Sequence, residues 1–145
     1  MMKDVGISEI MRMAIELGAC EKTGGVSDWK TISWLFFSPQ GLEFCKKNNF
    51  PSLETFTRID NEPLIVNNIF VNAGYLQRTN DSNIAIIGET DAELVFDDPT
   101  KVHKVVVMHG AKVFVTARNY AVVKLLNIGE NKVIYNKDKT AVILR

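Results

Sequence analysis

The chain has 145 residues, of which 46% are hydrophobic and 23% are charged. This composition is typical of a folded globular protein and argues against intrinsic disorder. A chain of this length buries roughly two thirds of its unfolded surface, which is enough for a core of its own. No stretch approaches the ~18 apolar residues that a membrane span requires, and the N-terminus lacks the apolar core of a signal peptide. We therefore expect a soluble, cytoplasmic protein.

The charge is balanced in total but not along the chain. Residues 1–100 hold 8 Lys and Arg against 15 Asp and Glu, which gives minus 7, whereas residues 101–145 hold 9 against 2, which gives plus 7. The basic half could complement the rest of the fold or meet an anionic partner. The two cysteines, Cys20 and Cys45, form no C-x-x-C motif, which favours reduced core thiols over a zinc site or a disulfide.

The first sixty residues carry the apolar spacing and capping residues of short helices. A stripe from Ile7 to Leu17 precedes Gly18, and Ser27 is a plausible N-cap for a helix from Asp28 to Phe37. Ser38-Pro39 then starts a helix to Lys47, and Pro51 opens a short one through Phe56. We expect this helical head, residues 1–60, to cap the remainder through Trp29, Trp34, Phe36 and Phe37.

From residue 61 onward the apolar period changes from 3.6 to 2, which predicts a β body over residues 61–145. The predicted strands are centred on the runs Leu64–Val66, Ile69–Val71, Ile84–Ile87, Leu94–Phe96, Val105–Met108, Val113–Val115, Val122–Val123, Val133–Tyr135 and Val142–Leu144. The last four runs begin at 113, 122, 133 and 142, so alternate starts differ by 20 both times. This step favours a short irregular β-helix with two strands per coil, although a β-sandwich or a small barrel also suits such strands. The predicted fold class is α+β.

A coil of 20 residues predicts specific neighbours. Lys104 should lie one rung from Lys124, Lys112 from Lys132, and Arg118 from Asp138. Rungs are about 4.8 Å apart, so the two lysine pairs should repel and the last pair should attract.

Catalytic chemistry is present only in fragments. The two histidines, His103 and His109, read as surface or turn residues and lie too far apart to share a metal. The acidic stretch around Asp91, Glu93 and Asp97 lacks the calcium-loop pattern and reads as a solvated edge. No phosphate-binding, dinucleotide, nucleophile-elbow or zinc-protease motif occurs, and the aromatic and basic residues of the last third lack a nucleic-acid-binding pattern. We expect no catalytic residue, cofactor or metal.

Three motifs resemble a known group of proteins. They are Phe50-Pro51-Ser52-Leu53-Glu54-Thr55, Val106-Val107-Met108-His109-Gly110 and Ile128-Gly129-Glu130-Asn131-Lys132-Val133. With a helical head, they resemble small uncharacterised proteins encoded in prophages and mobile elements of gut bacteria, which implies a virion-associated alternative to the cytoplasm. Residues 80–145 also look like the short-stranded solenoids of bactofilins and phage fibres, a resemblance of fold only, since bactofilins lack such a head.

Two functions from different classes follow. The first is a non-enzymatic structural or interaction protein that binds an unknown protein or anionic macromolecule through a flat basic β face of Lys104, Lys112, Lys124 and Lys132. The alternative is a carbohydrate-binding or carbohydrate-active β-helix that uses Asp91, Glu93, Asp97, Tyr120 and Tyr135. A homo-oligomer through β faces or edges is a further option.

Overall fold

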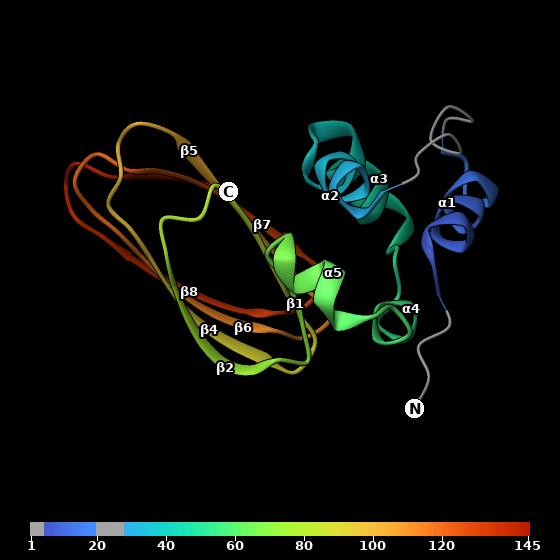
Figure 1. Ribbon diagram of the computed structural model, residues 1–145. Helices are drawn as coiled ribbons and strands as arrows, with labels where there is room; N and C mark the ends of the chain where they lie inside the picture. The colour runs from blue at the N-terminus through green and yellow to red at the C-terminus, as the bar shows by residue number, and fades with distance from the viewer. Residues whose placement is uncertain (1–4, 20–27) are drawn as a thin grey trace. The chain divides into compact units, whose positions relative to one another are not determined.

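The computed structural model describes residues 5–19 and 28–145 and divides the chain into two compact units. The helical unit ends at Asn67 and the β unit runs from Asn68 to Arg145. The architecture is α+β, and the β unit is a solenoid of parallel strands (Figure 1).

The helical unit confirms the predicted short helices and adds one. Its helices are α1 (Ile7–Glu16), α2 (Trp29–Phe37), α3 (Pro39–Asn48), α4 (Leu53–Thr57) and α5 (Asn61–Val66). The Asp28 carboxylate, rather than Ser27, caps α2 by accepting a 2.7 Å hydrogen bond from the Thr31 amide; Ser27 and Cys20 lie outside the described residues. Ser38 caps α3 as predicted, accepting from the Gly41 amide at 3.0 Å.

Side-chain packing in the helical unit differs from expectation at Trp34. Phe37 is buried at 5% exposure, but Trp34 is 70% exposed and so contributes little to a packed interface. Helices α2 and α3 approach closely at Gly41, where an added Cβ would lie 1.8 Å from the Leu35 carbonyl oxygen. Only glycine fits at this crossing.

The predicted strand at Leu64–Val66 is wrong, because these residues form the end of α5. The preceding Asn61-Glu62-Pro63 supplies an acidic residue and a proline in the first helical turn, both of which favour a helix start. Ile65 and Val66 are 49% and 74% exposed, so this apolar run does not enter a core.

The β unit coils through two parallel sheets, with one strand of each sheet per coil. Sheet A has the order β1-β3-β5-β7-β9 and sheet B the order β2-β4-β6-β8. The strands are β1 (Ile69–Val71), β2 (Gly74–Thr79), β3 (Asn83–Ile87), β4 (Thr90–Phe96), β5 (Val102–Met108), β6 (Lys112–Ala117), β7 (Val122–Ile128), β8 (Lys132–Lys137) and β9 (Val142–Leu144). The solenoid prediction is therefore confirmed, and β2 is the strand that the sequence pattern missed.

The 20-residue step holds only in the later coils. Lys112 pairs with Lys132 and Val122 with Val142, each 20 apart, whereas Asp91 pairs with Lys112 at 21 and Tyr75 with Asp91 at 16. The upstream drift in the sequence is thus a real change of coil length.

The change in coil length is confined to one side of the solenoid. From sheet A to sheet B the path is constant at six residues, as from Ile69 to Tyr75 and from Leu126 to Lys132. From sheet B back to sheet A the path is 10 residues from Tyr75 to Ala85 but 15 from Asp91 to Val106.

The constant corner owes its shape to one left-handed residue in each coil. Asn72, Gly88, His109 and Gly129 occupy equivalent positions, with φ of 49°, 69°, 59° and 87°. Glycine and asparagine tolerate this backbone, which accounts for their recurrence here. Asparagine side chains also link neighbouring coils: Asn72 Oδ1 accepts from the Glu89 amide at 2.7 Å and Asn131 Oδ1 from the Gly110 amide at 2.7 Å.

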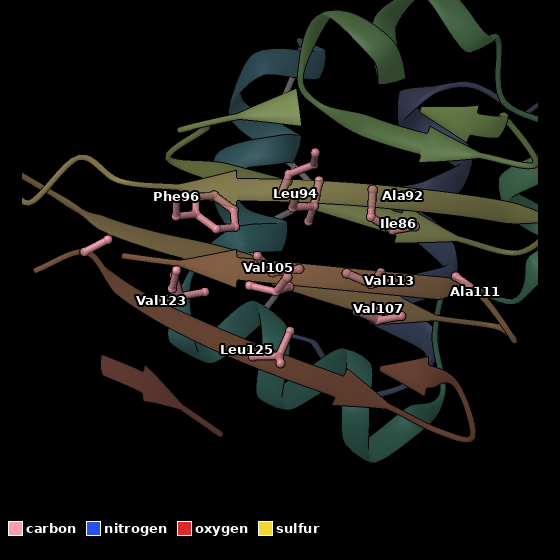
Figure 2. Close-up of a cluster of buried hydrophobic side chains, with 14 of the residues drawn as sticks. Ile86, Ala92, Leu94, Phe96, Val105, Val107, Ala111, Val113, Val123 and Leu125 are labelled. Carbon is pink, nitrogen blue, oxygen red and sulfur yellow. The ribbon is translucent and has the colours of Figure 1, made fainter. Parts of the chain in front are cut away.

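The core lies between the two sheets and follows the predicted alternation (Figure 2). In β6 the inward Val113 and Val115 are buried while Lys112 and Phe114 are exposed. Sheet A departs from alternation, because consecutive residues Val105 to Met108 are all buried. Continuous apolar runs of this kind are typical of parallel strands with apolar side chains on both faces.

The alternation predicts different costs for two valine-to-alanine changes in sheet B. Val115→Ala removes an inward, fully buried side chain, and Val95→Ala removes an outward, half-buried one. We expect Val115→Ala to lower the free energy of unfolding by about 2 kcal/mol, and Val95→Ala to lower it by less than half of that. Urea unfolding measures both, and equal losses would contradict the assignment of faces.

A second prediction concerns the last corner, where Asp138 accepts hydrogen bonds from the hydroxyl and amide of Thr140. The Thr140 hydroxyl and then its amide are the main causes that lower the pKa of Asp138 to about 2. A lowered pKa means that this carboxylate stabilises the fold above the ordinary aspartate pKa, and that the contribution is lost as the pH falls toward 2. Thr140→Val should raise the Asp138 pKa and Thr140→Ser should keep it low in an NMR titration; an unchanged pKa in Thr140→Val would refute the assigned cause.

Candidate interaction surface

The outer face of sheet B is a regular array of exposed side chains. Three columns run across its strands: Tyr75, Asp91, Lys112 and Lys132; Gln77, Glu93, Phe114 and Ile134; Thr79, Val95, Thr116 and Asn136. Successive members of a column lie about 4.8 Å apart along the ladder. We call this array the outer face of sheet B.

One end of the outer face is acidic and aromatic. Gln77 Nε2 donates to Tyr75 Oη at 2.7 Å and to Glu93 Oε2 at 3.2 Å, which joins β2 to β4 through side chains. Reduced hydration raises the pKa of Tyr75, and hydrogen bonding with Glu93 adds to the increase. Asp91 and Glu93 project from the same side of β4, as the sequence predicts.

The other end of the outer face combines apolar and basic side chains. Phe114 and Ile134 are neighbours on β6 and β8 and are 40% and 47% exposed. Lys112 and Lys132 form the adjacent column. Two exposed apolar side chains therefore lie beside a pair of like charges.

The four predicted lysines do not share one face. Both predicted ladders exist, because Lys104 pairs with Lys124 and Lys112 with Lys132. The first ladder is in sheet A and the second is in sheet B, so a single flat basic face is not what these residues form. Burial, and then the charge of Lys124, lowers the pKa of Lys104. The sequence revealed the 20-residue pairing but not which strands belong to which sheet.

The five residues of the carbohydrate alternative are also dispersed. Asp91 and Glu93 lie on the outer face of sheet B, whereas Asp97 follows β4 and accepts from Asn80 Nδ2 at 2.7 Å. Tyr120 is 65% exposed in the corner after β6. Tyr135 shares the inward column of Val115, and the Arg145 guanidinium lies 5.0 Å from its ring centre.

The predicted attraction between Arg118 and Asp138 is replaced by a different ion pair. Arg118 lies 3.7 Å from Asp97 Oδ2, on the preceding coil, while Asp138 binds amides and a hydroxyl of its own corner. The prediction overlooked that a carboxylate followed by Thr two residues later closes a local turn.

The prediction of a surface or turn position is correct for His109 and wrong for His103. His109 occupies the left-handed corner position after β5, but His103 is fully buried. Its place in β5 is inward, in register with Val123, so the strand alternation itself could have indicated burial. No group of three metal-ligating side chains occurs among residues 5–19 and 28–145.

Three residues of the outer face escaped the sequence-based selection of sites, namely Tyr75, Gln77 and Ile134. Tyr75 and Gln77 lie on β2, whose Gly, Gln and Arg residues obscure the strand pattern. The outward parity of Ile134 follows from its place beside Phe114, which was the available signal.

The helical unit contains an apolar cavity of about 480 Å³. Its walls include Met11 and Ala14 of α1, Leu35 of α2, and Phe44 and Cys45 of α3. Burial raises the pKa of the Cys45 thiol to about 12, so this cysteine is protonated near neutral pH and unsuited to act as a nucleophile. The predicted buried thiol is thus confirmed at Cys45.

Comparison of the chain with protein-family models, curated proteins and solved structures finds no match. In the described part of the chain, no helix is long and apolar enough to cross a membrane. The functional argument therefore depends on the geometry of the chain itself.

The raised pKa of Cys45 predicts slow chemistry at this thiol. In a Cys20→Ser variant, which leaves Cys45 as the remaining cysteine, alkylation by iodoacetamide at pH 8 should be at least about 100-fold slower in the folded protein than in urea. Mass spectrometry of quenched samples gives both rates. Comparable rates in the two states would show that the thiol is accessible and ionised.

Proposed function

We propose that this chain is a non-enzymatic interaction protein that binds a protein partner through the outer face of sheet B. The observation that carries the proposal is the exposure of Phe114 and Ile134 on neighbouring strands beside Lys112 and Lys132. Apolar side chains in a flat, charged surrounding are the composition of a binding hot spot with a polar rim.

The rigidity of the sheet supports this role. Each of the two inner strands, β4 and β6, is paired along its length with strands on both sides. A surface that is already ordered loses little conformational entropy when a partner binds, so a modest contact area can give useful affinity.

The charges of the outer face favour a partner with acidic and apolar groups. Lys112 and Lys132 are directly opposite each other, and like charges at this position destabilise a ladder. An acidic side chain bound between them would remove the repulsion and would lie beside the apolar pair. The acidic residues Asp91 and Glu93 at the other end would orient the partner by repelling its acidic part.

A glycan is the second candidate, and one specific observation favours it. Tyr75, Gln77 and Glu93 form a hydrogen-bonded row of exposed groups, with an aromatic face and polar atoms that could contact sugar hydroxyls. Of the residues selected from sequence, Asp91 and Glu93 belong to this version; Asp97, Tyr120 and Tyr135 lie elsewhere.

The biological setting is part of the proposal. A prophage or mobile-element origin, with a cytoplasmic or virion-associated location, is inferred from the resemblance of the sequence motifs. Genes for phage tails, lysis or defence beside this gene would support that origin.

The two lysine ladders provide a matched test. Lys112→Ser with Lys132→Ser changes sheet B, and Lys104→Ser with Lys124→Ser changes an equivalent ladder in sheet A. With a photoreactive residue in place of Thr116 on the outer face, we expect a specific protein adduct in cells that disappears with the first pair of changes and persists with the second. Circular dichroism of each variant confirms that the coil is retained.

Two outcomes would contradict the protein-binding proposal. Adducts that are equally sensitive to both pairs of changes would remove the outer face of sheet B from consideration. Binding to a glycan array that Tyr75→Ala abolishes, without any protein adduct, would favour the glycan in place of the protein.

A further inference from the structure

His103 occupies an unusual place for a titratable side chain, the interior of the β solenoid. It is the second residue of β5, in register with Val123 on β7, and its side chain is fully buried. Its ring packs against Phe96 of β4, with ring centres 4.8 Å apart. Any charge on this imidazole would be separated from water, so its hydrogen bonds decide its state.

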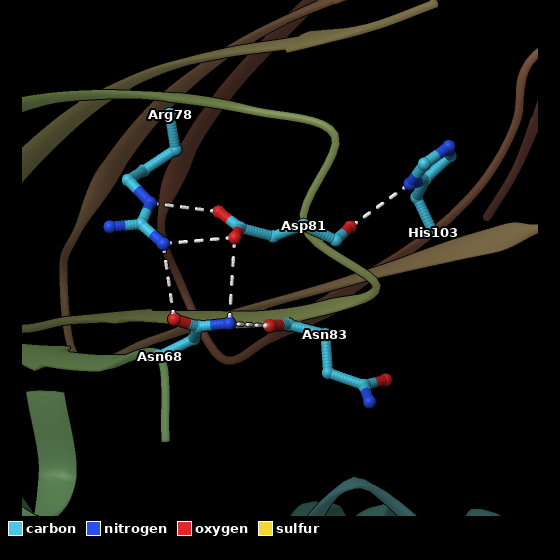
Figure 3. Close-up of polar contacts among 5 residues, drawn as sticks. All are labelled: Asn68, Arg78, Asp81, Asn83 and His103. Atoms are coloured by element: carbon cyan, nitrogen blue, oxygen red, sulfur yellow. Dashed lines mark hydrogen bonds and ion pairs between the residues drawn. The ribbon is translucent and has the colours of Figure 1, made fainter. Parts of the chain in front are cut away.

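Both ring nitrogens of His103 face backbone carbonyl oxygens. Nδ1 lies 3.0 Å from the Asp81 oxygen, and Nε2 lies 3.0 Å from the Asp98 oxygen; Figure 3 shows the contact with Asp81. A carbonyl oxygen only accepts hydrogen bonds, and a neutral imidazole carries a single N–H. The neutral ring would therefore direct a nitrogen lone pair at one of the two oxygens, whereas the imidazolium donates to both.

The charged groups around His103 come from both adjoining corners. Between β2 and β3, the Asp81 carboxylate receives two 2.9 Å hydrogen bonds from Arg78, which also donates to Asn68 at 3.2 Å (Figure 3). This corner is therefore internally neutralised. The Asp81 carbonyl remains available to His103.

The corner between β4 and β5 is the more acidic surrounding of His103. Its carboxylates are Asp97, which pairs with Arg118 at 3.7 Å, and Asp98. Hydrogen bonds from the Thr100 hydroxyl and amide lower the pKa of Asp98, and the nearby charges of Lys101 and His103 lower it further. On β5 itself Lys104 has the outward parity, and β7 presents the apolar Val123 beneath the ring. An ionised Asp98 favours a positive charge on His103.

We propose that His103 is a buried imidazolium that ties the corner at 80–82 to the corner at 97–101, and that the folded β unit depends on this proton. The unfolded chain gives up the same proton as the pH rises through the ordinary histidine range near 6.5. In the alkaline part of that range the folded protein then holds one proton more than the unfolded chain. The stabilisation is complete at lower pH and declines as the pH rises, by up to tenfold in the folding equilibrium constant for each pH unit.

The decisive measurement uses the unmodified chain. A long-range ¹H–¹⁵N spectrum at pH 7 distinguishes an imidazolium, with both ring nitrogens protonated, from a neutral ring with one bare nitrogen. The chain has only two histidines, and His109→Asn, a change chosen because Asn72 occupies the equivalent corner, leaves His103 as the single signal. Two protonated nitrogens are expected for His103, and a neutral tautomer at pH 7 would overturn the proposal.

Unfolding by urea between pH 6 and pH 9 provides the second readout. The His109→Asn variant should lose stability as the pH rises, and His103→Gln, whose amide can donate to one carbonyl and carries no charge, should lose that pH dependence. An identical pH dependence in both variants would overturn the proposal. If His103→Gln does not fold, the spectrum of the His109→Asn variant decides alone.

Discussion

The parallel hydrogen-bond ladder between successive coils is the constraint on which the rest of the β unit depends. Because each residue pairs with the residue one coil later, a side chain keeps its face and its neighbours along the whole ladder. The inward columns become a continuous core of small and branched side chains, and the outward columns become rows of like or complementary groups. Core packing and surface chemistry are thus two results of a single register.

The corners determine whether that register can be kept. On one side the chain crosses between the sheets through a left-handed residue and always takes six residues from Ile69 or its equivalents to the outward column of Tyr75. On the other side the crossing varies in length, and polar side chains hold it together. His103, Asp81 and Arg78 belong to this variable side, which explains why so many buried or half-buried polar groups gather there.

Much of the fold could be predicted from the sequence, because strand alternation and the 20-residue step are properties of the ladder itself. The pairs Lys104 with Lys124 and Lys112 with Lys132 followed from that step. Their separation into two sheets did not, since the repeat gives the distance along a coil but not the corner positions. Leu64 to Val66 failed because a short apolar run does not distinguish a strand from a helical turn. His103 was misplaced because residue type was given more weight than its inward position in β5.

The one-sided variation in coil length has a consequence for how such a chain can change. An added or deleted residue in the crossing from sheet B to sheet A, such as the segment 97–101 or 118–121, alters only a bend of the backbone. The same change in the six-residue crossing would shift every later side chain to the opposite face. The solenoid therefore has one side that tolerates insertions and one that does not, and a tag or probe placed at residues 118–121 would leave all ladder pairs unchanged.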